Sequence, residues 1–226
     1  MSSLINLNKY YKHSHISKAK FRVFLKHFCY DETAERIALE TGISRQSVLL
    51  ILGKIRVRIS EWCEEEERMR GEVEVDESYF GAKRVRGKRG RGASGKVPVI
   101  GLLKRKGKVY TRVVSNCSRE QLLPIIKGKV LSESTVFTDA WRSYDSLILH
   151  GYDHYRIHHH ENEFARGKNH VNGIESFWSF TKARLLKMKG VRKDKFVLHL
   201  KESEFRWNYR KQMYKVMLKK LRESPL

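Results

Sequence analysis

Cysteine and proline are both scarce in this chain of 226 residues, which contains three of each. The cysteines, Cys29, Cys63 and Cys117, are scattered and form no CxxC pair. The sequence therefore indicates neither a zinc ribbon nor a disulfide framework, and we expect a reduced, cytoplasmic protein. Because prolines are few and 40% of the residues are hydrophobic, most of the chain is expected to fold around a core.

Long apolar runs are also missing. The longest of them, such as residues 97–103, are far shorter than the roughly 20 residues that a transmembrane helix needs. No signal peptide opens the sequence. The sequence therefore predicts no membrane partner.

Acidic residues are few: the sequence contains 25 Asp and Glu residues and 47 Lys and Arg residues, which gives a formal net charge of +22. A chain this basic repels itself unless an acidic polymer neutralises it, which favours a nucleic acid as the partner. On charge alone, a basic ribosome-associated or membrane-surface protein is the alternative.

Residues 1–70 have the pattern of a small helical module. Ala38, Gly42 and Val48 have the spacing of a helix-turn-helix, where two helices must pack closely around a left-handed turn. Arg45 and Gln46 would then lie on the exposed leading face of the second helix, where recognition helices contact base edges. An ordinary helical hairpin is the alternative. The expected caps are Asp31 or Thr33 and then Ser44, and the expected buried residues are Phe21, Phe24, Leu25, Phe28, Val48, Leu52, Ile55 and Ile59.

Residues 71–190 alternate between strand-like and helix-like patterns. A half-buried strand is predicted at residues 72–80, further strands at 97–103, 108–114, 135–138 and 152–157, a short helix after Ser118, another helical segment near 144–149, and a long helix from about residue 172. This order favours an α/β domain in which helices cover a mixed sheet. The narrower prediction, an RNase H-like catalytic domain, is an analogy from the order of the elements. Residues 191–226 are expected to form a basic helical tail that packs on this core.

Residues 83–96 are rich in glycine, arginine and lysine, and we expect them to form a basic loop. A solvated hairpin insertion is the alternative. Because the loop is uniformly cationic, it is expected to contact phosphates without reading sequence. The expected contacts are Lys83, Arg84, Arg86, Lys88, Arg89 and Arg91.

Three acidic residues, far apart in the sequence, occupy positions that suit metal binding. Asp76 and Asp139 lie on strand-like segments, and Glu175 lies near the start of the long helix. Glu175, Trp178 and Lys182 recur at helical spacing and share one helical face. Two divalent cations held by carboxylates stabilise the entering and leaving oxygens of phosphoryl transfer, and magnesium prefers such hard ligands. Each acid alone is better explained as a cap, a turn residue or an exposed pair, but their combination favours a two-metal site.

Three segments carry a family resemblance: residues 75–81 (VDESYFG), 136–141 (VFTDAW) and 170–178 (HVNGIESFW), followed by Lys182 and the segment 205–208 (FRWN). Over about residues 70–210, the chain resembles the bacterial insertion-sequence transposases of the DDE superfamily, whose core is RNase H-like. Many relatives begin with a cysteine-rich zinc ribbon, which this chain lacks. Recognition of DNA ends would therefore depend on the helix-turn-helix and on basic surfaces.

The resemblance implies a magnesium-dependent transposase in which Asp76, Asp139 and Glu175 hold two metal ions. Lys182 would contact DNA, and Mn²⁺ is expected to substitute for Mg²⁺. Asn172, one turn before Glu175, is the other candidate for the third ligand, but only Glu175 carries the charge to bind the metal. Trp178 and His170 are expected to line the site, and Arg184 and Lys187 to bind DNA.

The expected activity is binding of terminal inverted repeats, nicking that exposes 3′ hydroxyls, and joining of these ends to target DNA. Because transposition joins ends in pairs, a homodimer or larger assembly on double-stranded DNA is expected in the bacterial cytoplasm, in association with the nucleoid. One alternative is a structure-selective nuclease of the same fold, such as a junction resolvase. The other is a non-catalytic helix-turn-helix regulator. A zinc site at the histidine-rich residues 158–160 is disfavoured, because successive side chains of a strand point to opposite faces.

Overall fold

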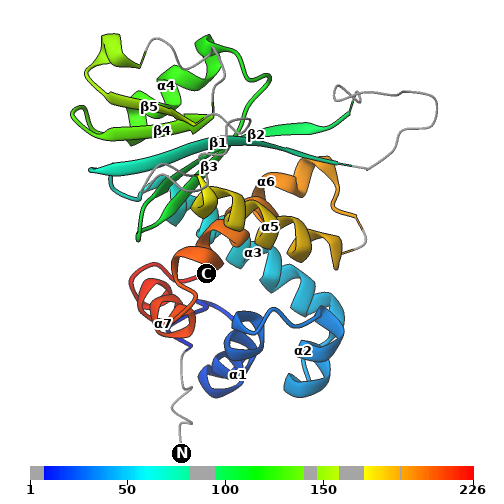
Figure 1. Cartoon of the computed structure of the whole chain (residues 1–226). Helices are drawn as coiled ribbons and strands as arrows, with labels where there is room; N and C mark the ends of the chain where they lie inside the picture. The colour runs from blue at the N-terminus through cyan, green and yellow to red at the C-terminus, as the bar shows by residue number, and fades with distance from the viewer. Residues whose placement is uncertain (1–7, 82–94, 140–146, 158–170, 189) are drawn as a thin grey trace, which may run out of the picture. The chain divides into compact units, whose positions relative to one another are not determined.

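The chain forms two compact units in the computed structural model, which describes residues 8–81, 95–139, 147–157, 171–188 and 190–226 (Figure 1). One unit, which we call the helical unit, comprises Met1–Glu64 and Tyr209–Leu226. The other, which we call the sheet unit, comprises Glu65–Asn208. Within the described residues, no helix is both long enough and apolar enough to cross a membrane.

The helical unit contains α1 (Lys18–Cys29), α2 (Ala34–Thr41), α3 (Arg45–Glu64) and α7 (Met213–Glu223). Thr33 caps α2, and the hydroxyl of Ser44 accepts the backbone N–H of Ser47 at the start of α3. Gly42 ends α2 with a φ of 61°, a left-handed conformation that glycine adopts without strain. The eight side chains predicted to form the core of this module are all buried, so that prediction is confirmed.

The carboxyl-terminal segment divides between the two units, which differs from the predicted single tail at residues 191–226. The helix α6 (Lys193–Asn208) belongs to the sheet unit, whereas α7 belongs to the helical unit. The reason is the apolar face of α7, because Met217 and Leu221 are fully buried in the helical unit. Close to the chain end, Arg58 of α3 also donates a hydrogen bond to the carbonyl oxygen of Pro225 at 3.0 Å.

The sheet unit is built on five strands: β1 (Glu72–Phe80), β2 (Val97–Lys104), β3 (Val109–Val113), β4 (Thr135–Asp139) and β5 (Asp153–Ile157). Their order in the sheet is β3-β2-β1-β4-β5. The pairs β1–β2 and β2–β3 are antiparallel, whereas β1–β4 and β4–β5 are parallel. A short 3₁₀ helix, Ile148–His150, precedes β5. The sheet is therefore mixed, with β1 at its centre.

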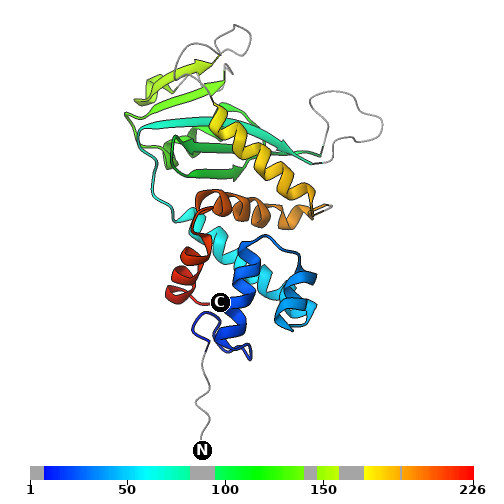
Figure 2. The same ribbon diagram turned by 60° about the horizontal axis from the view of Figure 1, so that its bottom comes forward.

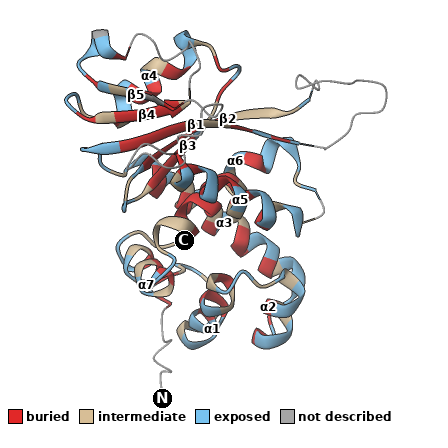
Figure 3. Cartoon of the chain, in the orientation of Figure 1, coloured by how far each residue is buried: buried red, intermediate tan, exposed pale blue. Residues whose placement is uncertain are grey.

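Helices cover both faces of this sheet (Figures 1 and 2). On one face, α4 (Arg119–Lys129) packs Leu122 and Ile126 against Val73 and Val75 of β1. On the other face, α5 (Asn172–Leu186) and α6 complete a second core, which includes Phe177. Figure 3 shows the buried positions concentrated in the strands and in the helices that face them. The predicted RNase H-like α/β domain, a mixed sheet flanked by helices, is confirmed.

The strand β1 was predicted to be half-buried, and this expectation was wrong. Glu74, on the face expected to contact solvent, is only 1% exposed. The reason is that α5 covers this face, so both faces of β1 are packed.

The outer edge of β3 is covered by polar side chains of α6. The amide oxygen of Asn208 accepts the backbone N–H of Val109 at 2.7 Å, and its amide nitrogen donates to the carbonyl oxygen of the same residue at 2.8 Å. Glu204 accepts the backbone N–H of Thr111 at 2.8 Å. Because these side chains form hydrogen bonds with the backbone groups at the edge of β3, they fix α6 against the sheet.

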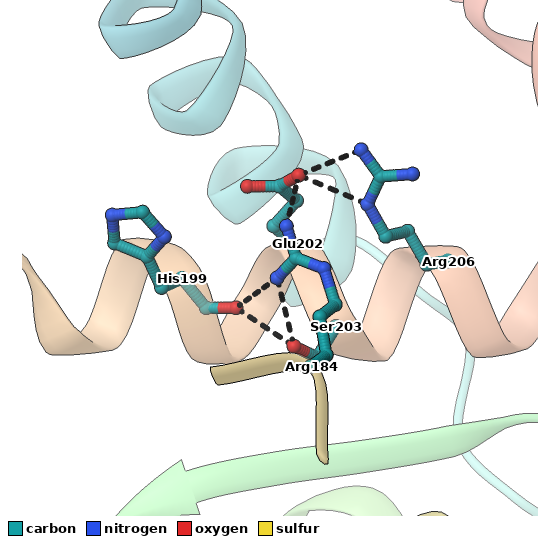
Figure 4. A network of polar contacts seen from close by, with 5 residues as sticks. All are labelled: Arg184, His199, Glu202, Ser203 and Arg206. Atoms are coloured by element: carbon teal, nitrogen blue, oxygen red, sulfur yellow. Dashed lines mark hydrogen bonds and ion pairs between the residues drawn. The ribbon is translucent and has the colours of Figure 1, made fainter. Parts of the chain in front are cut away.

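A buried ionic network joins α5 to α6 (Figure 4). Arg184 of α5 donates to the carboxylate of Glu202 and to the hydroxyl of Ser203, and Arg206 donates to the same carboxylate. Arg184 and Glu202 are 3% and 0% exposed. Since two guanidinium groups share one buried carboxylate, the network holds the two helices in one relative position.

Candidate active site

Two aspartates lie side by side on adjacent parallel strands of the sheet unit. In β1 and β4, Glu74 pairs with Phe137, and the same register carried two residues further sets Asp76 beside Asp139. Side chains two residues apart on a strand share a face, so both aspartates are on the face that α5 covers. The parallel pairing of β1 and β4 thus unites two acids that are 63 positions apart in the sequence.

A third carboxylate adjoins this pair. Ligand oxygens of Asp76, Glu77 and Asp139 all lie within 4.8 Å of one another, and each of the three side chains is partly buried. Burial first, and then the negative charge of Asp139, raise the pKa of Asp76 from its ordinary 3.8 to about 6, although hydrogen bonds from Glu77 and Trp178 oppose the rise. The site therefore concentrates negative charge that a cation would relieve.

The indole of Trp178 orients the Asp76 carboxylate. Trp178 Nε1 donates a hydrogen bond to Asp76 Oδ2 at 3.0 Å. The residue paired with Asp76 on β2 is Gly101, and a Cβ there would lie only 2.4 Å from the indole atom Cζ2. The absence of a side chain at Gly101 therefore lets the ring approach the strand closely and reach the acid. Phe80 packs against the same indole edge-on, with ring centroids 5.9 Å apart.

Glu175 lies on α5, one turn before Trp178, and its side chain is exposed. Within the described residues, it is not part of the three-carboxylate cluster around Asp76. It is nevertheless close enough to act on that acid, because after burial and Asp139 it makes a smaller contribution to the raised pKa of Asp76. The structure thus unites Asp76 with Asp139 and places Glu175 near them, outside the cluster.

Lys182 is exposed one turn after Trp178, and its Nζ lies 5.8 Å from the centre of the Phe80 ring. Lys187, at the end of α5, is exposed as well. Both positions leave the side chain available to a phosphate. Arg184 was also predicted to bind DNA, but this prediction was wrong, because its guanidinium is buried against Glu202.

The remaining predicted site residues fall into three groups. Asn172, the first residue of α5, is exposed. Arg45 and Gln46 are exposed at the start of α3, where Arg45 forms an ion pair with Glu35 at 2.6 Å. His170 and the predicted phosphate contacts of the basic loop lie outside the described residues; these contacts are Lys83, Arg84, Arg86, Lys88, Arg89 and Arg91.

Sequence reasoning missed two acids at this site. Glu77 was not among the predicted ligands, yet its carboxylate joins the cluster. Glu74 was read as a solvated strand residue, but its carboxylate accepts hydrogen bonds from the backbone of α5 and from Arg105. The signal available in the sequence was the run of acids at positions 72, 74, 76 and 77 on one basic chain.

The donor set suits a hard divalent cation. All three groups of the cluster offer carboxylate oxygens, the ligands that Mg²⁺ and Mn²⁺ prefer over the nitrogen and sulfur ligands typical of zinc. A bound cation would also favour the charged form of Asp76, whose pKa is raised by burial and by Asp139.

Comparisons with known proteins identify the family of this chain. The family model of the ISXO2-like transposase domain matches residues 68–208, more than half of the chain. A transposase-like protein of Haemophilus influenzae is 48% identical over 103 residues, which make up 46% of this chain and 83% of that protein. A protein in the transposable element ISH50 of Halobacterium salinarum is 30% identical over 174 residues, which make up 70% of this chain and 59% of that protein. The chain thus spans less than two thirds of the second relative.

Solved structures show a more distant similarity. A chain of the Mos1 strand transfer complex is 12% identical with a TM-score of 0.36, covering 89% of this chain and 75% of that chain. A chain in the structure of a simian T-cell lymphotropic virus intasome is 12% identical with a TM-score of 0.38, covering 79% of this chain and 66% of that chain. From the match over residues 68–208, the chain belongs to the ISXO2-like transposase family, within the insertion-sequence transposases of the DDE superfamily.

Proposed function

We propose that this transposase cuts and rejoins DNA at the site formed by Asp76 and Asp139, with Glu175 as the third acid. The observation that supports this proposal best is the placement of the two aspartates abreast on adjacent parallel strands, with ligand oxygens close enough to share a cation. A metal-dependent phosphoryl transfer needs such an arrangement. The family to which the chain belongs supports the same reaction class.

The carboxylates present fit a pair of Mg²⁺ ions, and Mn²⁺ would fit as well. When bound, such ions stabilise negative charge on the oxygens that enter and leave during in-line displacement. Asp76, Asp139 and Glu175 would hold these ions. Glu77 adds a further carboxylate beside Asp139, and Asn172 remains the alternative to Glu175 as a neutral oxygen ligand.

Other residues of α5 hold and orient the reacting groups. Trp178 fixes the orientation of the Asp76 carboxylate through its Nε1–H. Lys182, exposed one turn further along the same face, would bind a DNA phosphate next to the acids. Lys182 would thereby hold the scissile phosphate at a fixed position next to the acids.

Two successive reactions would use this one site. In the first, water attacks a phosphodiester bond at the element end, and the bond to the 3′ oxygen breaks to release a 3′ hydroxyl. In the second, that hydroxyl attacks a phosphodiester bond of target DNA, which breaks as the new bond forms. Both are displacements at phosphorus, so the same acids serve each step.

DNA binding would involve both units. In the helical unit, Gln46 and Arg45 lie exposed at the start of α3, the position from which a recognition helix contacts bases. In the sheet unit, the exposed Lys182 and Lys187 and the basic loop at residues 83–96 would contact phosphates. The partners are double-stranded DNA, as terminal inverted repeats and as target, and a second copy of the chain when two ends are joined.

The test is a cleavage assay with DNA that carries the inverted repeats flanking the gene. With Mg²⁺, the wild-type protein should release nicked and joined products, and Asp76→Ala should abolish them while leaving the gel shift on the same DNA unchanged. Asp153→Ala is the matched control, because Asp153 is an exposed aspartate of the same sheet. Wild-type rates of cleavage in Asp76→Ala would remove the proposed site.

A further inference from the structure

A buried carboxylate lies on β1 two residues before Asp76. Glu74 Oε2 accepts a hydrogen bond from the backbone N–H of Ile174 at 2.9 Å, and Oε1 accepts one from Arg105 Nε at 3.1 Å. At the start of α5, Val171 occupies the cap position and makes no side-chain cap. Glu74 therefore supplies the missing cap from another element, and its negative charge complements the positive end of the helix.

The helix is attached to β1 at a second point, one turn later, where Trp178 donates to Asp76. The two acids are two residues apart on one face of β1, and the two α5 residues that they contact are four apart. Two strand residues span about 6.6 to 6.8 Å, and four helical residues rise about 6 Å. Because these spans are similar, both attachments form at the same time in the observed register of α5 on β1.

Glycines permit the close approach at both points. A Cβ at Gly173 would lie 2.5 Å from Leu103 Cδ2 of β2 and 2.8 Å from Glu74 Oε2, and a Cβ at Gly101 would lie 2.4 Å from the Trp178 ring. Real Cβ atoms essentially never come so close to another atom. A glycine therefore lies next to each of the two attachment points.

The position of Glu175 depends on this register, because Glu175 lies between Ile174 and Trp178 on α5. A shift of α5 by one residue would move the helix about 1.5 Å along its axis and turn it by about 100°. Glu175 would then occupy a different position relative to Asp76 and Asp139. A group that holds the first turn of α5 thus helps to set where the third acid lies relative to the other two.

We propose that Glu74 is a positioning residue of the active site, which sets Glu175 and Trp178 against Asp76 by holding the first turn of α5 on β1. The inference rests on the proposed function, since it assigns Glu74 to the geometry of that site. Glu74 itself contacts neither the reacting phosphate nor a metal ion in this scheme.

Glu74→Gln tests the proposal with Glu72→Gln as the matched control. Both substitutions remove one charge from the same strand, and both carboxylates pair with Arg105, at 3.1 Å for Glu74 and 3.7 Å for Glu72. Their side chains are 2% and 47% exposed, respectively. Of these two acids, Glu74 is the one that receives the α5 backbone N–H.

Two measurements on the DNA-free protein follow from this difference. Glu74 accepts from Ile174 with one oxygen and from Arg105 with the other, whereas glutamine has one oxygen and an NH₂ group that cannot accept. Hydrogen exchange at the Ile174 amide should therefore become faster in Glu74→Gln and stay at the wild-type rate in Glu72→Gln. Isothermal titration with Mn²⁺ should show an affinity about 10 to 100 times weaker in Glu74→Gln, because groups that orient metal ligands have effects of this size. A purely structural role would lower the unfolding temperature and leave the Mn²⁺ affinity of the folded protein unchanged.

Gly173→Ala provides a second route to a displacement of the first turn of α5, because its added methyl group would meet Leu103 Cδ2 and Glu74 Oε2 while the charge of Glu74 stays in place. It should weaken Mn²⁺ binding as Glu74→Gln does. Wild-type Mn²⁺ affinity and wild-type amide exchange in Glu74→Gln would overturn the positioning role. Failure of the wild-type protein to bind Mn²⁺ or to cleave DNA would instead count against the proposed function, and amide exchange would still decide whether Glu74 holds α5.

Discussion

Replacing Asp76 with asparagine should make the metal-free protein more stable at neutral pH, even though it removes the proposed central metal ligand. The Asp76 carboxylate is partly buried, lies close to Asp139 and has a pKa raised from 3.8 to about 6. Its charged form is therefore disfavoured in the folded state. Asparagine keeps the size and an oxygen that accepts the Trp178 N–H, without the charge.

The size of the effect follows from the pKa of Asp76. A shift of one pKa unit corresponds to about 1.4 kcal/mol of free energy. The rise of the Asp76 pKa from 3.8 to about 6 therefore corresponds to about 3 kcal/mol as an upper limit. Because the side chain is partly exposed, solvent screening reduces the expected gain to about 1 to 2 kcal/mol. A charged group that is kept partly buried for its function lowers the free energy of unfolding in this way.

The gain also has a definite pH dependence. Below about pH 4 the Asp76 carboxyl is protonated in both the folded and the unfolded state, so the wild-type protein and Asp76→Asn should be equally stable. Between about pH 4 and pH 6 the unfolded state loses its proton first, and the wild-type protein loses stability as pH rises. Above about pH 6 both states are ionised, and the difference should stay constant.

Urea unfolding in EDTA at pH 4, 5, 6 and 7.5 measures this difference, with the exposed Asp153→Asn as the control. Mg²⁺ should reverse the order at neutral pH, because it stabilises only the variant that binds it, by about 2.7 kcal/mol at 100 times its dissociation constant. An Asp76→Asn variant that is less stable than wild type in EDTA at pH 7.5, or equally stable at every pH, would refute the reasoning.

Two further predictions concern glycines and use the same unfolding measurement. Gly101→Ala should destabilise the sheet unit by about 1 to 3 kcal/mol, because its Cβ would meet the Trp178 indole on α5. Gly128→Ala in α4 should be neutral or stabilising, because the added Cβ would have open space around it. Gly42→Ala should destabilise the helical unit by about 1 to 2 kcal/mol through backbone strain at its φ of 61°. Gly53→Ala, inside α3 with free space around its Cβ, should stabilise that unit by up to about 1 kcal/mol. Equal effects within either pair would contradict the role of the glycine.

Much of the fold could be predicted from local patterns. Apolar side chains at helical spacing identified the buried face of α3, and Gly42 identified the turn between α2 and α3. The strands ending near Asp139 and carrying Asp76 followed from alternation and from turn residues. Family resemblance in the segments around Asp76, Asp139 and Glu175 then indicated a transposase, which the family match bears out.

Polar side chains that the fold buries could not be predicted. Arg184 lies in a run of basic residues and was assigned to DNA, yet α6 places Glu202 against it and buries the pair. Glu74 alternates with valines as an exposed residue of a half-buried strand would, yet α5 covers it. In both cases the covering group lies on a separate helix, 18 residues along the chain for Arg184 and 100 for Glu74, and local periodicity does not reveal it.

The sequence by itself determined the basic charge, the order of helices and strands, and which acids are candidates for chemistry, because these depend on composition and on nearest neighbours along the chain. The tertiary structure decided that Asp76 and Asp139 lie abreast, that Glu77 joins them, and that α7 belongs to the helical unit. Strand register and helix packing set these relations, and both arise from contacts between residues far apart in the chain.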